Sequence, residues 1–419
     1  MNPAITHHES TGGQFDVAVI GGGPAGAALA TFLARKGWRC AIFEKARFPR
    51  YHIGESLIPD TYGVLDRLGL LPKLRVSNYP VKHGVRFIPD DGKETVSFHF
   101  SKTIEGERAR TWQVERSSFD LMLLRHAAQQ GVTVYEETAV QSVIFEKDRA
   151  VGVSVKKDGE PDSRDFAARV VVDASGHMTL LGKQLNLKKE VPGLCKGCLW
   201  GYWRGGKRWP GIDAGETTMF LLPDGGWFWY IPLPDDIVSV GIVADPSHLF
   251  PQPGAEQQTY LRLAQGHARL WERLDQAQLV GPVRTARRLA YFNSRTCGDG
   301  WVMIGDARAF LDPIYSSGLY LALTSAELAA DCVDAALAAN DLSQAALGTF
   351  EPKLMSGVDV IRRLIHAFYD PQFSFTKFLQ RHPQQWKSLI DCLIGDVLKD
   401  MLEFKTALAE MTPVPPPLG

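Results

Sequence analysis

The stretch FDVAVIGGGPAG, residues 15–26, decides the fold of this chain. An apolar, β-rich run, Phe15–Ile20, precedes a GxGxxG pattern of glycines, and the helix-forming sequence AALATFLARKG follows it. Strand, tight turn and helix in this order form the dinucleotide-binding unit of a Rossmann-like sheet. Gly21, Gly23 and Gly26 permit the turn, close approach of the backbone to a pyrophosphate and tight helix–strand packing. The sequence therefore predicts that a dinucleotide binds here, with its phosphates at the helix N-terminus.

A second strand extends this predicted site. The run CAIFEK, residues 40–45, places Glu44 about 20 residues beyond the glycines, where an acidic side chain can bind a ribose diol. Ala25 within the glycine turn and Lys45 directly after Glu44 complete the cofactor-binding residues predicted around the turn.

The composition excludes several classes of partner. The chain has 419 residues, 45% of them hydrophobic, and a formal net charge of −1, which predicts a globular protein of two coupled domains and no nucleic-acid partner. No apolar stretch reaches the ~18 residues that a membrane helix needs. Residues 1–14, MNPAITHHESTGGQ, are expected to form a disordered lead-in without a signal-peptide pattern. We therefore expect a cytoplasmic protein that does not associate with a membrane.

Six cysteines are too few for a disulfide framework at this length. Cys195 and Cys198 form a CKGC pair, but no second CxxC or HxxxH pair could complete a zinc site. No metal is therefore expected, and the role of the pair stays open.

Two later segments indicate which dinucleotide binds. VVVDASG (170–176) and WVMIGDARAFLDPIYSSGLYLAL (301–323), together with the glycine turn, resemble the FAD-binding pattern of the aromatic hydroxylase superfamily. This resemblance implies that Asp306 holds the ribityl chain. It also implies that Arg116, in the helix-opening segment VERSSFDLMLLRHA, lies along the FAD.

The expected architecture is mixed α/β, with a Rossmann-like FAD-binding domain, a β-sheet substrate domain and a helical C-terminal part. The FAD-binding domain comprises residues 15–79, 112–184 and 291–345; the substrate domain 80–111 and 185–290; the helical region 346–412; and a frayed tail 413–419.

Trp227 and Trp229 lie two positions apart in WFWYIP, residues 227–232, so in a strand they share one face. The stretch resembles the WxWxIP signature of flavin-dependent halogenases. In that family such a pair, here called the indole wall, keeps the organic substrate away from the flavin, where contact would favour oxygen insertion. Packing in the core is the alternative role.

A lysine provides the second point of resemblance. FPRYHIGESLIP (48–59) resembles the corresponding halogenase segment, and in NYPVKHG (78–84) Lys82 matches the lysine of halogenases that act on pyrroles. An ammonium group can donate hydrogen bonds to hypohalous acid, whereas a neutral amine can itself be halogenated, and burial makes either role possible by lowering the pKa. Lys73, at a predicted helix end, is the alternative lysine.

The stretch DPIYSSG, residues 312–318, resembles the family's halide loop. Ser317 and Gly318 occupy the halide-binding positions, and Gly318 also borders the flavin. Tryptophan halogenases carry a glutamate before this pair, but here the position is Tyr315. The difference argues against free tryptophan as substrate and puts a glutamate partner for Lys82 in doubt.

Taken together, the resemblance implies an FADH2-dependent halogenase of secondary metabolism, such as antibiotic biosynthesis. It would use O2 and chloride or bromide to make hypohalous acid and halogenate an electron-rich aromatic group. AFYDPQFSFTKFLQ (367–380) and LIGDVL (393–398) resemble halogenases that act on a pyrrolyl group thioester-linked to a carrier protein. A free phenol, direct aromatic monooxygenation and a flavin-binding module without turnover are the alternatives. Only one GxGxxG has strand–turn–helix context, so a separate flavin reductase is expected to supply reduced FAD to a monomer or homodimer.

Overall fold

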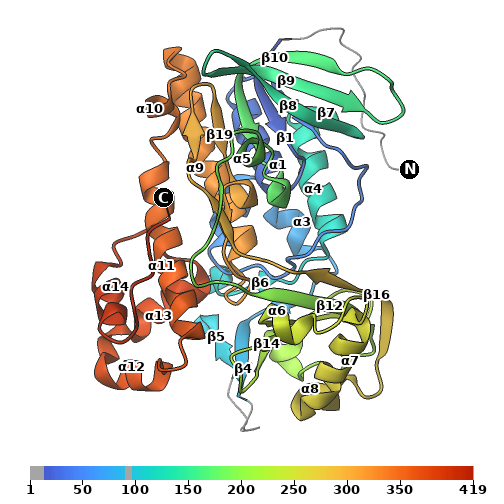
Figure 1. Cartoon of the computed structure of the whole chain (residues 1–419), viewed down its shortest axis with the longest axis vertical. Helices are drawn as coiled ribbons and strands as arrows, with labels where there is room; N and C mark the ends of the chain where they lie inside the picture. The colour runs from blue at the N-terminus through green and yellow to red at the C-terminus, as the bar shows by residue number, and fades with distance from the viewer. Residues whose placement is uncertain (1–13, 90–96, 419) are drawn as a thin grey trace.

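The computed structural model describes residues 14–89 and 97–418, so most of the predicted disordered lead-in lies outside the described residues. Figure 1 shows a parallel sheet with its helices in the upper half, a second sheet at the lower right and a group of helices at the lower left. The mixed α/β architecture predicted from the sequence is confirmed.

The upper sheet is built around the strand that the opening stretch predicted. Its order is β18 (Cys297–Gly298), β19 (Trp301–Met303), β10 (Arg164–Asp173), β1 (Phe15–Ile20), β2 (Cys40–Phe43) and β7 (Thr133–Tyr135). Strands β19, β10, β1, β2 and β7 run parallel, and Ile20 at the end of β1 stands opposite both Phe43 and Asp173. The carboxyl ends of three strands therefore meet at one edge, the position where ligands bind in such sheets.

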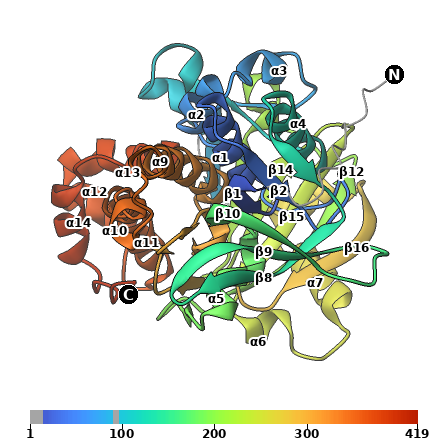
Figure 2. The ribbon, with the colours of Figure 1, turned by 90° about the horizontal axis from the view of Figure 1, so that it is seen from above.

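The two faces of β1 enter different parts of the core. Val17 and Val19 pack in the cluster that includes α1 (Pro24–Arg35), α4 (Arg116–Gln129) and α9 (Ser317–Ala339). Ala18 and Ile20 pack instead with β8 (Thr138–Glu146) and β9 (Arg149–Lys157). Seen from above, α1, α4 and α9 lie on one side of β1 and β10, and β8 and β9 on the other (Figure 2).

The lower sheet has the order β16 (Gln278–Ala286), β12 (Gly197–Arg204), β15 (Ile237–Ala244), β14 (Trp227–Pro232), β13 (Thr217–Leu221), β4 (Gly84–Ile88) and β5 (Phe98–His99). Phe228 and Tyr230 of β14 pack in the cluster that includes residues of α7 (Glu256–Gly266) and α8 (Ala268–Leu274). Trp227 and Trp229 belong to the cluster on the opposite face. The prediction that both indoles share one strand face is confirmed.

The C-terminal helices are α11 (Glu351–Tyr369), α12 (Phe375–Arg381), α13 (Trp386–Ile394) and α14 (Leu402–Ala409). The prediction of a frayed tail is wrong for residues 413–418. Leu418 is buried, and the Arg362 guanidinium donates a hydrogen bond to the carbonyl oxygen of Pro416. These two contacts hold the chain end against α11.

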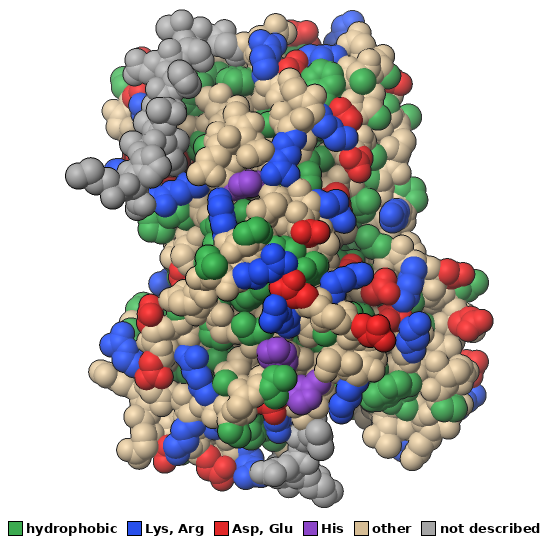
Figure 3. Space-filling view, turned by 180° about the vertical axis from the view of Figure 1, so that it is seen from behind, with side chains coloured by type: hydrophobic (Ala, Val, Ile, Leu, Met, Phe, Trp, Pro, Cys, Tyr) green, Lys and Arg blue, Asp and Glu red, His purple; other side chains and the backbone are tan. Residues whose placement is uncertain are grey.

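The remaining elements connect these layers. They are α2 (Thr61–Arg67), α3 (Leu71–Arg75), β3 (Val81–Lys82), β6 (Thr111–Trp112), α5 (Leu180–Gln184), β11 (Lys188–Glu190), α6 (Pro246–Leu249), β17 (Tyr291–Asn293), β20 (Ala309–Phe310) and α10 (Gln344–Leu347). Basic and acidic side chains are interspersed over the face seen in Figure 3, in keeping with the net charge of −1.

The glycine turn provides a test of the packing of α1 on β1. A methyl group at Gly26 would collide with the carbonyl oxygen of Gly21, whereas at Gly23 it would meet only the Arg50 guanidinium at 3.5 Å. We expect Gly26→Ala to lower the free energy of unfolding of the FAD-free protein by about 1–3 kcal/mol, as overpacking does. Gly23→Ala should leave it nearly unchanged. Equal unfolding curves for the two variants in urea would contradict this packing.

Candidate active site

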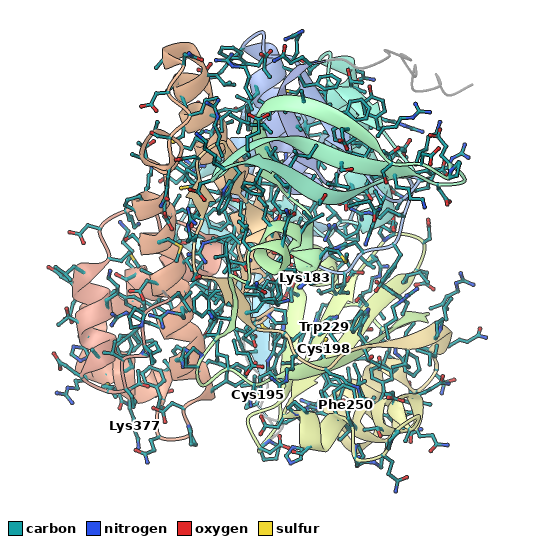
Figure 4. All side chains as sticks on the ribbon, turned by 45° about the horizontal axis from the view of Figure 1, so that its top comes forward. Lys183, Cys195, Cys198, Trp229, Phe250 and Lys377 are labelled. Atoms are coloured by element: carbon teal, nitrogen blue, oxygen red, sulfur yellow. The ribbon has the colours of Figure 1, made fainter. Side chains whose placement is uncertain are left out.

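A cavity of about 1380 Å³ runs from the carboxyl edge of the parallel sheet to the indole face of the lower sheet. Figure 4 shows its two sides: Lys183 lies in the upper half, and Trp229 and Cys198 lie in the lower sheet. The predicted site residues that line this cavity are Gly21, Gly23, Ala25, Glu44, Lys45, Arg116, Trp227, Trp229, Asp306 and Gly318. Gly26, Lys82 and Ser317 do not line it.

The glycine turn is shaped to bring backbone close to a ligand. Gly21 has a φ of +98°, and a methyl group there would stand 2.6 Å from the carbonyl oxygen of Ala174. Glu44 fixes the turn from below, because its carboxylate accepts hydrogen bonds from the backbone N–H groups of Gly22 at 2.8 Å and Ala46 at 2.9 Å. A carboxylate has about four lone-pair positions, so Glu44 keeps acceptor capacity for a ribose.

Arg116 is held rigidly at the middle of the cavity. Its guanidinium forms a bidentate pair with Asp120, with N–O distances of 2.7 and 2.9 Å, and donates to the carbonyl oxygens of Ile53 and Gly54. Asp120 also pairs with Arg50 at 2.9 Å. Two guanidinium groups therefore share one buried carboxylate, which leaves net positive charge beside the cavity for an anionic ligand.

Asp306 lies three residues after the end of β19 and lines the cavity together with the glycine turn. Its backbone oxygen accepts a hydrogen bond from the Tyr291 hydroxyl at 2.6 Å, and its side chain stands 3.5 Å from His177. Burial raises the pKa of the Asp306 carboxyl above its ordinary value. A carboxyl placed in this way gains stability from hydroxyl donors, such as those of a ribityl chain.

The indole wall is tilted rather than flat. The rings of Trp227 and Trp229 are 6.2 Å apart with 54° between their planes, and Trp200 of β12 lies 6.5 Å from Trp229. All three line the cavity, and none is more than 6% exposed. Gly241 on β15 makes this possible, because any side chain there would collide with the Trp229 ring. The two indoles are therefore inclined to each other and not stacked.

Lys82 lies behind the cavity wall. It is fully buried, and its Nζ donates to Ser56 Oγ at 2.8 Å and to the carbonyl oxygen of Leu57 at 3.1 Å. Burial lowers the pKa of its ammonium group to about 7, against a smaller opposing effect of Glu216. Ser56 and its partner Thr217, 3.0 Å away, line the cavity and separate it from the lysine.

Two buried carboxylates, Glu216 and Glu55, were not predicted from the sequence. Glu216 supplies the negative charge that favours the ammonium form of Lys82, although no direct hydrogen bond joins the two. Glu55 lines the cavity, accepts a hydrogen bond from the Tyr202 hydroxyl at 2.7 Å, and has a pKa raised to about 7 by burial. Glu55 lies within the quoted segment 48–59, but no sequence signal distinguishes a buried carboxyl there from a surface one.

The predicted halide loop, residues 312–318, borders the cavity through Pro313, Ile314, Ser316 and Gly318. Ser316 adopts a left-handed conformation with a φ of 52°, and α9 begins at the next residue. Ser317 is buried and does not itself line the cavity, although both of its neighbours do. The helix start gives this loop the positive potential that an anion requires.

The two cysteines of the CKGC pair have different surroundings. Cys198 is buried, Cys195 is exposed, and both are free thiols. Burial raises the pKa of Cys198 to about 12, so its thiolate is disfavoured. Within residues 14–89 and 97–418, no group of three or more His, Cys, Asp or Glu side chains could hold a metal ion. Over the same residues, no helix combines the length and apolarity needed to cross a bilayer.

Comparison with known families and relatives agrees with this geometry. Residues 14–197 match the FAD binding domain family, and residues 216–404 match the tryptophan halogenase family. The chain is 31% identical to the 1H-pyrrole-2-carbonyl-[peptidyl-carrier protein] chlorinase of Pseudomonas fluorescens, over 92% of this chain and 90% of the relative.

The chain belongs to the flavin-dependent halogenases. A 1H-pyrrole-2-carbonyl-[peptidyl-carrier protein] brominase of Pseudoalteromonas luteoviolacea is 32% identical over 78% of this chain and 79% of the relative. The structure of a flavin-dependent brominase superposes with a TM-score of 0.85 at 28% identity, over 95% of this chain and 97% of that chain. A myxobacterial chondrochloren halogenase gives 0.80 at 31% identity, over 94% and 95%.

Some other halogenases are longer than this chain. A tryptophan 2-halogenase of Chondromyces crocatus is 34% identical over 77% of this chain but only 61% of its own length. The family resemblance inferred from the sequence motifs is confirmed, and with it FAD as the cofactor of this enzyme and halide as its substrate.

The lowered pKa of Lys82 predicts a pH-dependent cost to stability. Below pH 7 the Lys82 side chain is charged in both the folded and the unfolded state, so the desolvation of the ammonium group lowers the free energy of unfolding by its full amount. This desolvation cost falls as the pH rises from 7 toward 10.5, the ordinary lysine pKa, because the folded state then holds the neutral amine. Lys82→Met should therefore be more stable than the wild type at neutral pH. The difference in the free energy of unfolding between Lys82→Met and the wild type should shrink by about 1.4 kcal/mol for each pH unit above neutral pH.

Urea unfolding of both proteins between neutral pH and about pH 9 measures this difference, because the range lies between the folded and the ordinary pKa of the lysine. Lys73→Met is the control, because Lys73 is partly exposed on α3, where its Nζ donates to the side-chain oxygen of Gln129. An advantage of Lys82→Met that stays constant with pH would show that the lysine is solvated.

Proposed function

We propose that this halogenase transfers chlorine or bromine to a pyrrolyl group held as a thioester on a carrier protein. The observation that carries the proposal is a lysine buried completely behind a cavity wall, one serine away from the cavity. Two relatives whose names specify carrier-bound pyrrole-2-carbonyl substrates support the choice of acceptor. Tyr315 in place of the glutamate of tryptophan halogenases also favours an acceptor other than free tryptophan.

FAD would occupy the cavity along the glycine turn, Glu44, Lys45, Arg116 and Asp306. When bound in its reduced form, FAD would supply two of the four electrons that O2 takes up, and the halide would supply the other two, so that hypohalous acid and water are the products. The backbone of Ser317–Gly318 would hold the halide at the N-terminus of α9. Because only one dinucleotide turn is present in the sequence, a separate flavin reductase would deliver the reduced cofactor.

Lys82 would control the oxidised halogen. With a pKa of about 7, both its charged and neutral forms are populated near neutral pH, so the ammonium can polarise hypohalous acid by hydrogen bonding. Its burial excludes water, which would otherwise compete for the reactive halogen. Ser56 lines the cavity and accepts a hydrogen bond from Lys82. The halogen would therefore pass from the cavity to the lysine at Ser56.

Product masses test this assignment. With FAD, a flavin reductase, NADH and bromide, we expect brominated pyrrolyl carrier protein, and little product from the free acid or from phenols. Lys82→Ala should still bind FAD and consume O2 but lose at least about 100-fold in halogenation, a loss typical of removing a positioned catalytic group.

Lys73→Ala is the matched control and should behave as the wild type. Bromination of free phenols in preference to the carrier-bound pyrrole would overturn the acceptor. Halogenation by Lys82→Ala at the wild-type rate would remove Lys82 from the mechanism.

The indole wall makes a separate prediction. If Trp227 and Trp229 screen the flavin, a single Trp→Phe change at either site should raise the share of O2 that ends as hydrogen peroxide, because it opens a gap on the cavity side. Trp203→Phe is the control, since Trp203 is equally buried on the opposite face of the same sheet. If the Trp227→Phe and Trp229→Phe variants bind FAD and yield no more peroxide than Trp203→Phe, the indole wall has a packing role only.

A further inference from the structure

Behind the indole wall, three side chains from distant parts of the sequence form one hydrogen-bonded chain. Trp227 Nε1 donates to the Tyr369 hydroxyl oxygen at 2.9 Å, and that hydroxyl donates to Asp312 Oδ2 at 2.9 Å. The other carboxylate oxygen of Asp312 accepts from the backbone N–H of Ile314 at 2.9 Å. The last residue of α11 therefore connects the wall to the halide loop.

The chemistry of the three groups fixes the direction of this chain. An indole nitrogen only donates, so the Tyr369 oxygen must accept from Trp227. The single hydroxyl proton of Tyr369 is then available only for Asp312, whose two oxygens both act as acceptors. This arrangement requires the carboxylate form of Asp312, since a proton on Oδ2 would oppose the tyrosine proton.

The chain is placed to support the cavity rather than to line it. Trp227 and Ile314 line the cavity, whereas Asp312 and Tyr369 stand behind them. Asp312 is 4% exposed and Trp227 1%, so neither group has bulk water to replace a lost partner. Lys196 lies 4.6 Å from the centre of the Tyr369 ring and pairs with Asp245, which adds a second constraint on the ring.

We propose that Tyr369 is a positioning residue for halogenation: its hydroxyl fixes the Trp227 indole and the halide loop in one arrangement. The effect on catalysis rests on the proposed function of the wall and the loop. Without the hydroxyl, the Trp227 N–H and one oxygen of Asp312 both lose their buried partner, and the two cavity-lining segments can move independently. The oxidised halogen is then lost more often before it reaches the acceptor.

The first test measures position without turnover. In FAD-bound protein labelled with ¹⁵N-tryptophan, the Trp227 indole N–H resonance, assigned by its absence in Trp227→Phe, should shift in Tyr369→Phe. Tyr230→Phe is the matched control: Tyr230 lies on the other face of β14, and its hydroxyl donates to the carbonyl oxygen of Lys207 at 3.1 Å. An unchanged Trp227 resonance in Tyr369→Phe would overturn the proposal.

Asp312→Asn provides a second variant of the same chain, because an amide offers one acceptor oxygen where the carboxylate offers two. Burial raises the pKa of Asp312 to about 7, so the wild-type Trp227 resonance should also move as pH falls through this value. In Asp312→Asn the Trp227 resonance should no longer move with pH. The titratable groups that interact electrostatically with Asp312 are Lys196, Tyr369, Tyr315 and Cys198. A wild-type resonance that is unaffected by pH would count against the connection.

The second test measures turnover. The ratio of halogenated product to hydrogen peroxide should fall about fivefold in Tyr369→Phe, the factor that corresponds to one lost hydrogen bond of typical strength. Tyr230→Phe should keep the wild-type ratio. A ratio unchanged in Tyr369→Phe would reject its role in catalysis. If the wild type itself made no halogenated product, the proposed function would fail, while the tryptophan resonance would still decide whether Tyr369 positions the wall.

Discussion

The parallel pairing of β1 with β10 and β2 is the constraint on which the site depends. It brings the ends of three strands, far apart in sequence, to one edge, so that Gly21, Glu44 and Ala174 follow side by side. Close packing at Gly26 then places the start of α1 directly over this edge. The cavity exists because the lower sheet meets the same edge with its indole face, which leaves a space large enough for a dinucleotide.

The two ends of this cavity differ in chemistry. At the dinucleotide end, Arg116 and Arg50 are both held by the single carboxylate of Asp120, which leaves net positive charge there. At the far end, aromatic rings line the cavity, and Lys82 lies fully buried behind Ser56 with its pKa lowered to about 7. A hydroxylase needs open contact between flavin and substrate, whereas under the proposed function the indoles and Ser56 would stand between them. That difference would explain how one FAD fold can support halogen transfer instead of oxygen insertion.

The sequence predicted the local elements well, because strand, turn and helix signals act over a few residues. The glycine turn with its flanking strand and helix, and the strand that carries Trp227 and Trp229, were both expected. Contacts made by tertiary packing were not predictable in this way. The tilt of the indoles depends on Gly241 of another strand, and the partner of Trp227 comes from a helix 142 positions away. The position of Lys82 behind Ser56 likewise depends on long-range packing, which no motif records.

The central claim is that oxygen never reaches the organic acceptor directly. The most direct measurement is turnover of the pyrrolyl carrier protein with bromide and isotopically labelled O2, followed by the mass of the pyrrolyl group. The account predicts product in which bromine replaces hydrogen and from which the heavy oxygen is absent, because that oxygen leaves as water. Heavy oxygen bound to the pyrrole ring would contradict it and identify the enzyme as a direct monooxygenase.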